Sequence, residues 1–118
     1  MKRNQFEQEG YLVVRSLISG DELYVLDRMV DLLLNGLLKP EVAYKDWLPE
    51  QFYTFWEPGM KDRTDLPRPE RVRLMSNMYH HHSYFRSMGG HPRIYNVVSS
   101  LLQSCVQMFS DTVFMKPA

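Results

Sequence analysis

The longest amphipathic pattern in the chain follows a helix-start signal at Ser19. Ser19 and Glu22 stand three residues apart, the spacing of a capping box, in which each side chain caps the other's backbone amide. Apolar residues then recur at alternating steps of three and four, the period of one helix face. The pattern predicts a helix over about residues 20–38, stopped by Pro40, with its apolar face on a core. That face carries Leu23, Leu26, Val30, Leu33 and Leu37.

Shorter patterns predict further elements on both sides of this helix. Residues 6–10 suit one or two helical turns ending at Gly10, and the aromatic and β-branched residues 11–14 suit a short strand. Gly89-Gly90 ends a partly helical stretch, and His91-Pro92 opens another helix, because proline is tolerated where no amide proton is needed. Two more pieces are predicted to be extended, namely residues 71–74 and the long strand 106–115.

Residues 39–69 interrupt these periodic patterns. The segment holds five of the seven prolines and both tryptophans, Trp47 and Trp56, with Phe52, Tyr53 and Phe55. A disordered linker would be poor in aromatic residues, so we expect an ordered insertion that packs its aromatics on the domain or lines a cleft. Plain packing and an aromatic cage for a ligand are both open, and residues 61–65, which alternate in charge sign, are expected to form a solvated loop.

Composition and length argue against several functional classes. Lys plus Arg and Asp plus Glu number 14 each, so the formal net charge is zero and no global field attracts nucleic acid or an anionic membrane. The length suits one domain, and no apolar run is long enough to span a bilayer. The start of the chain lacks a secretory signal, and the single cysteine indicates a reducing compartment. We therefore expect a cytoplasmic protein with Cys105 as a buried structural thiol.

Candidate chemistry is sparse. Three consecutive histidines, His80 to His82, cannot all reach one metal ion from a helix, whereas His80 and His82 would share a face of a strand with His91 as a third ligand. Exposed or partly buried imidazoles at a helix start are the alternative. The arginines between Arg63 and Arg73 form a solvated face by default, yet one beside a strand could grip a carboxylate ligand.

The order of several weak motifs resembles the phytanoyl-CoA dioxygenase family. The matching pieces are Phe6 to Val14, Gly20-Asp21-Glu22-Leu23 leading a long helix, His91-Pro92-Arg93-Ile94, and the strand that closes on Lys116-Pro117. They cover both ends of the chain but not the Pro- and Trp-rich middle. The resemblance implies an α+β chain with the N-terminal helices and first strands of a double-stranded β-helix (jelly-roll) oxygenase fold, as an incomplete barrel over 1–118.

That family is similar to other Fe(II)- and 2-oxoglutarate-dependent oxygenases, whose iron is held by a His-x-Asp pair and a distal His. No histidine here is followed two residues later by Asp, so we expect no metal ligand in this chain. The resemblance implies that the iron site lies beyond Ala118 and that this N-terminal portion is inactive alone. It also implies two contacts to 2-oxoglutarate. Arg73 aligns with a lysine of the family, and Thr112 lies four residues before Lys116 on the closing strand.

Three readings follow, and they leave open whether the chain is an enzyme. The first is the N-terminal part of such an oxygenase, whose complete domain would bind Fe(II), 2-oxoglutarate and a small-molecule substrate. It predicts exposed strand edges, with self-association or pairing with a missing C-terminal half. The second is a small non-catalytic binding or scaffold domain that uses its aromatic-rich middle. The third is a metal-binding module through His80, His82 and His91. None of the three involves nucleic acid or a membrane.

Overall fold

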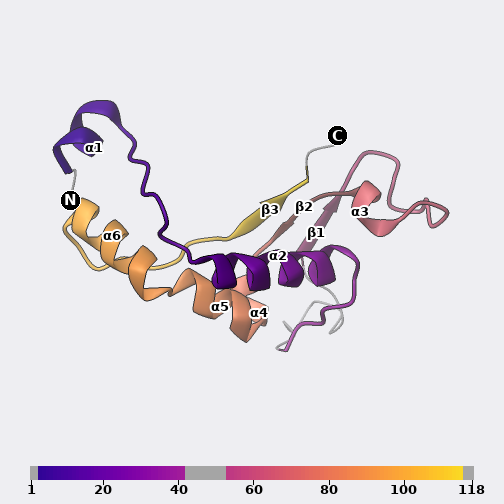
Figure 1. The fold of residues 1–118 in the computed structure, drawn as a ribbon. Helices are drawn as coiled ribbons and strands as arrows, with labels where there is room; N and C mark the ends of the chain where they lie inside the picture. Colours follow the sequence, from indigo (N-terminus) through magenta and orange to yellow (C-terminus); the bar gives the residue numbers. More distant parts are fainter. Residues whose placement is uncertain (1–2, 42–52, 116–118) are drawn as a thin grey trace.

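Helices and short strands follow one another along the chain in the computed structural model, which describes residues 3–41 and 53–115 (Figure 1). The protein is therefore of mixed α+β type, with a small open sheet. Its elements are α1 (Arg3–Glu9), α2 (Gly20–Leu34), β1 (Tyr53–Trp56), α3 (Arg68–Arg71), β2 (Val72–Ser76), α4 (Met78–His81), α5 (Ser83–Gly89), α6 (Pro92–Leu102) and β3 (Thr112–Phe114).

Helix α2 begins as the sequence predicts. The Ser19 hydroxyl accepts the amide proton of Glu22 at 3.2 Å, and the Ser19 amide donates to Glu22 Oε1 at 3.0 Å, which confirms the capping box. The helix ends at Leu34, short of the predicted residue 38. Gly36 has a φ of +72°, which turns the chain out of the helix before Pro40 is reached.

The sheet has the strand order β1-β2-β3, with both neighbouring pairs antiparallel. Phe55 pairs with Leu74 and Trp56 with Val72, so Arg73 has no residue opposite it on β1. Such a bulge changes the side to which the following side chains point. Val72 and Met75 are accordingly both buried although they are three residues apart, a spacing that regular alternation would place on opposite faces.

The core lies between one face of this sheet and the helices. Six buried apolar side chains form it in the described ranges, and they come from α2, β2, α4 and α5. Helix α2 crosses the sheet with α4 and α5 beside it in Figure 1. The other face of the sheet has no described helix against it in this cluster. The buried set is Leu33, Leu34, Val72, Met75, Met78 and Phe85.

Two predicted strands differ from the structure. Residues 11–14 form no strand, and the predicted strand 106–115 contracts to three residues, Thr112–Phe114. The reason is the lack of neighbours, because a strand persists only where another strand pairs with it. Val13 and Phe109 are exposed to 66% and 95% instead of packing in a core.

Helices α1 and α6 lie outside the core. Figure 1 places α1 and α6 at one end of the molecule, away from the sheet. Helix α6 begins at Pro92 as predicted, but none of its residues is buried. The radius of gyration is 16.7 Å, whereas a closely packed domain of this length has about 13.5 Å. The chain is thus more extended than a closed domain of its size.

The aromatic segment contributes to the fold. Its part within the described residues supplies β1, and the ring of Trp56 packs against the core. The guanidinium groups of Arg68 and Arg71 lie 5.5 and 5.1 Å from the ring centroid of Trp56. Packing thus accounts for Trp56, while Trp47 and Phe52 lie outside the described residues. The loop 61–65 is exposed throughout, as predicted.

Candidate functional site

A groove of about 350 Å³ lies on the side of the sheet against which no described helix packs. All three strands contribute to it, at the end where β1 leaves the sheet. Phe55 and Phe114 keep 44% and 69% of their surface exposed there. The side chains around the groove are Phe55, Trp56, Glu57, Arg73, Leu74, Phe114 and Met115.

Arg73 enters this groove because of the bulge in β2. With Val72 and Met75 both turned into the core, Arg73 and Leu74 both face away from it, and both line the groove. The Arg73 side chain is exposed, and no carboxylate of the described residues pairs with it. An unpaired guanidinium beside apolar walls can hold a carboxylate by two parallel hydrogen bonds.

Thr112, the other predicted contact, lies elsewhere. Its hydroxyl is 3.1 Å from that of Ser76, the residue opposite it on β2. Thr112 is exposed but does not line the groove around Arg73. Of the two predicted co-substrate residues, Arg73 thus lines the groove, whereas Thr112 forms a cross-strand hydroxyl pair with Ser76.

The neighbouring arginines have structural partners, contrary to the predicted solvated face. Arg68 is partly buried and donates to the carbonyl oxygens of Leu33 and Leu34 at 3.1 and 2.9 Å, closing the C-terminus of α2. Burial, and then the nearby Arg71, lower the pKa of Arg68. Arg71 donates to the Lys61 carbonyl at 3.0 Å. Only Arg63, paired with the exposed Asp65, matches the solvated loop.

The histidines act as helix caps and as part of the core. His82 and His91 precede α5 and α6, and the Nδ1 atom of each accepts an amide proton two residues later at 3.1 Å. His81 is 1% exposed. Among the residues that the structure describes, no three His, Cys, Asp or Glu side chains are grouped so as to hold a metal ion. The described structure thus does not bring His80, His82 and His91 together with each other as a group of metal ligands.

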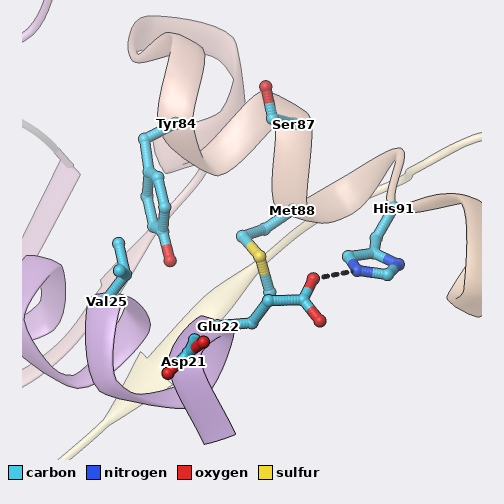
Figure 2. Close-up of a pocket in the computed structure, with 7 residues that line it drawn as sticks. All are labelled: Asp21, Glu22, Val25, Tyr84, Ser87, Met88 and His91. Carbon is cyan, nitrogen blue, oxygen red and sulfur yellow. Dashed lines mark hydrogen bonds and ion pairs between the residues drawn. The ribbon is translucent and has the colours of Figure 1, made fainter. Parts of the chain in front are cut away.

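A second hollow, of about 360 Å³, lies between α2 and α5 near the start of α6. Figure 2 shows Val25 and Glu22 on α2 facing Tyr84 and Met88 on α5. Val25, Met88 and the Tyr84 ring form its apolar walls. The carboxylates of Asp21 and Glu22 lie at one end. The complete lining is Asp21, Glu22, Val25, Tyr84, Ser87, Met88 and His91.

Glu22 joins three elements at the edge of this hollow. Its carboxylate accepts hydrogen bonds from the Ser19 amide, the His91 ring Nε2 and the Arg93 guanidinium. The Ser19 amide first, then His91 and the Ser19 hydroxyl, and finally the charge of Arg93 lower the pKa of Glu22 to about 2. Because His91 Nδ1 already accepts an amide proton, Nε2 carries the hydrogen that points at Glu22. Both ring nitrogens are thereby engaged.

Sequence reasoning finds half of this arrangement. The capping box identifies Glu22, but its partner His91 is 69 residues away, and no local spacing connects them. Arg93 completes the contact by donating to the Leu17 carbonyl at 2.8 Å. The cluster holds the start of α6 against the start of α2, so its evident role is to join helices.

Tyr84 brings a buried hydroxyl to this hollow. Its hydroxyl oxygen is buried, and no group in the described part of the chain hydrogen-bonds to it. Figure 2 shows the ring descending from α5 with the hydroxyl pointing toward α2, between Val25 and Met88. Burial, and then the Glu22 carboxylate, raise the pKa of Tyr84. The hydroxyl is therefore neutral at physiological pH and available as a donor or an acceptor.

The prediction that Cys105 is buried is wrong. It follows α6 and is exposed as a free thiol, because the residues around it form no strand that would cover it. Its side chain is therefore not the buried structural thiol that the sequence predicts.

Comparisons with models of protein families, with curated proteins and with solved structures found no match to this chain. The described structure is an α+β protein with an open three-stranded antiparallel sheet, helices on one face and a groove on the other. None of the helices in the described ranges combines the length and apolar character needed to cross a lipid bilayer.

Proposed function

We propose that this chain is the N-terminal portion of an Fe(II)- and 2-oxoglutarate-dependent oxygenase domain of the phytanoyl-CoA dioxygenase type. Arg73 in the groove is the observation that carries the proposal. The residue aligned with a co-substrate contact of that family is exposed among apolar walls and has no carboxylate partner among the described side chains. In this proposal, Arg73 binds a carboxylate of 2-oxoglutarate.

The face of the sheet on which no described helix packs supports the same proposal. In a jelly roll, one sheet packs over another and the cavity lies between them. Helices cover one face of this sheet, and the exposed Phe55 and Phe114 lie on the other. Aromatic side chains at such exposure are expected where a second layer would normally pack. We propose that this second layer comes from further strands of the same domain.

The residues that the structure describes form no group of side chains that fits an iron ion. The sequence has no His-x-Asp pair, and the ring nitrogens Nδ1 of His82 and His91 are occupied as helix caps. Fe(II) and the oxygenase reaction are therefore assigned to the complete domain, and this portion is proposed to be inactive alone. Its contribution is to bind and orient one end of the co-substrate.

Binding of 2-oxoglutarate to Arg73 tests the proposal. We expect Arg73→Ala to weaken 2-oxoglutarate binding about tenfold or more, because hydrogen bonds to charged groups contribute ~1.5–3 kcal/mol. Arg63→Ala is the matched control, since Arg63 lies in an exposed loop paired with Asp65. Glu57 lines the same groove, so Glu57→Gln should strengthen binding of the dianion. Calorimetric titration measures all three, and equal affinities in the Arg73 and Arg63 variants would refute the assignment.

A transcript sequence tests the domain assignment independently of binding. We expect an in-frame His-x-Asp motif within a few dozen nucleotides of the codon for Ala118. An in-frame stop codon immediately after Ala118, with no later strand-coding sequence, would contradict the proposal.

A non-catalytic binding domain is the second candidate function. The exposure of Phe55, at 44%, favours it, because this aromatic side chain of the middle segment lines the groove instead of packing in the core. The two functions separate in the titration, since a binding domain would show no preference for 2-oxoglutarate. For either function we propose the cytoplasm, because the exposed thiol of Cys105 suits a reducing compartment.

A further inference from the structure

The hollow between α2 and α5 is separate from the groove used in the proposed function. The two share no lining residue, and they involve different faces of the molecule. At about 360 Å³ the hollow has the size of a small-molecule site. Its chemistry can therefore be considered by itself.

Charge in this hollow is uneven. Glu22 carries a negative charge, but the Arg93 guanidinium pairs with it and His91 donates a hydrogen bond to it. Asp21, the adjacent carboxylate, also lines the hollow and has no ion pair within the described residues. One uncompensated negative charge thus stands at the end of the hollow, where a cation would be attracted.

The remaining walls suit an apolar body attached to such a cation. Val25 and Met88 lie on either side of the Tyr84 ring, and all three line the hollow (Figure 2). An aromatic ring attracts cations at its face, and a methionine side chain adapts its shape to a neighbour. The buried Tyr84 hydroxyl lacks a described hydrogen-bond partner, and its oxygen can accept a hydrogen bond from an ammonium group.

We propose that this hollow binds a small organic cation. The apolar part of the ligand lies between Val25, Tyr84 and Met88, and its ammonium group lies at the Asp21 carboxylate. Charge complementarity selects this occupant over a neutral or anionic molecule of the same shape, because the only unpaired charge on the described lining is negative.

Three probes with the same ring test the preference. Benzylamine is a cation at neutral pH, benzyl alcohol is neutral and benzoate is an anion. In calorimetric or NMR titrations of the unmodified chain, we expect benzylamine to bind about threefold to fivefold more tightly than benzyl alcohol, and benzoate to bind most weakly. The benzylamine preference should fall with added salt. Equal affinities for the three probes, or no binding of benzylamine, would overturn the proposal.

Variants locate the binding. Asp21→Asn should weaken benzylamine binding about threefold to fivefold and leave benzyl alcohol unchanged. Asp27→Asn is the matched control, because Asp27 is exposed on the same helix but does not line the hollow. Ser87→Trp, at an exposed position of the rim, should block all three probes. Benzylamine affinity that survives both Asp21→Asn and Ser87→Trp in folded protein would place its binding elsewhere and refute the assignment.

Discussion

Leu33 and Leu37 lie on the same predicted apolar face of α2, yet the structure gives them opposite surroundings. Leu33 is 1% exposed in the core, and Leu37 is 71% exposed beyond the end of the helix. Truncating Leu33 to alanine removes its buried methyl groups and leaves a cavity, which costs about 2–5 kcal/mol. At ~3 kcal/mol the unfolding equilibrium constant rises roughly a hundredfold.

This cost is large for so small a core. Domains of this length are stable by about 6–18 kcal/mol, and six buried apolar side chains place this chain toward the lower end. Leu33→Ala should therefore remove a substantial share of the stability. Leu37→Ala, the same truncation on an exposed side chain, should change it by less than ~0.5 kcal/mol.

Urea unfolding followed by circular dichroism at the helix wavelength measures both variants against the unmodified chain. The expected result is a much lower midpoint for Leu33→Ala and an unchanged midpoint for Leu37→Ala. Equal losses in the two variants would refute this reasoning, because they would show that Leu37 is as well covered in solution as Leu33.

Two further predictions concern pH and backbone conformation. The pKa of Glu22 is lowered from 4.5 to about 2, so its stabilising contribution is complete above pH 4.5 and is lost as the pH falls toward 2. Glu22→Gln should therefore be less stable than the unmodified chain at neutral pH and approach it in acid; a constant difference in urea midpoint across this range would contradict the assigned pKa. Gly36→Ala should cost about 1–2 kcal/mol from its φ of +72°, plus the crowding of a Cβ placed 3.3 Å from Arg68 Cδ. Gly10 also has a positive φ, +78°, but no atom lies within 4 Å of an added Cβ, so Gly10→Ala should cost less than Gly36→Ala. Equal losses of stability in thermal unfolding would show that the Arg68 contact is unimportant.

Local signals in the sequence predict the starts of the helices. Ser19 and Glu22 cap α2 as expected, and Pro92 opens α6, because each signal acts through backbone groups within one helical turn. The turn at Gly10 after α1 follows from the same local chemistry. The extended character of residues 71–74 is also largely found, in β2.

The candidate sites depend on contacts that no local pattern encodes. Arg73 faces the groove because β2 bulges against β1, and regular alternation would have placed Arg73 on the same side as the buried Met75. The family resemblance predicts Arg73 as a contact to 2-oxoglutarate. Its exposure among apolar walls is visible only once the strands of the sheet are paired. Tyr84 carries no sequence signal that it lies opposite Val25 on α2.

Short-range patterns in the chain are enough to predict where helices begin, which residues can cap them, and that helices and strands are mixed. Those properties depend on bonds between residues a few positions apart. The folded chain is needed to see which apolar residues are buried, which of the predicted strands persist, and which side of the sheet Arg73 occupies. Burial and strand pairing require a partner distant in sequence, and a residue such as Phe109 has the composition of a core without any neighbour to cover it.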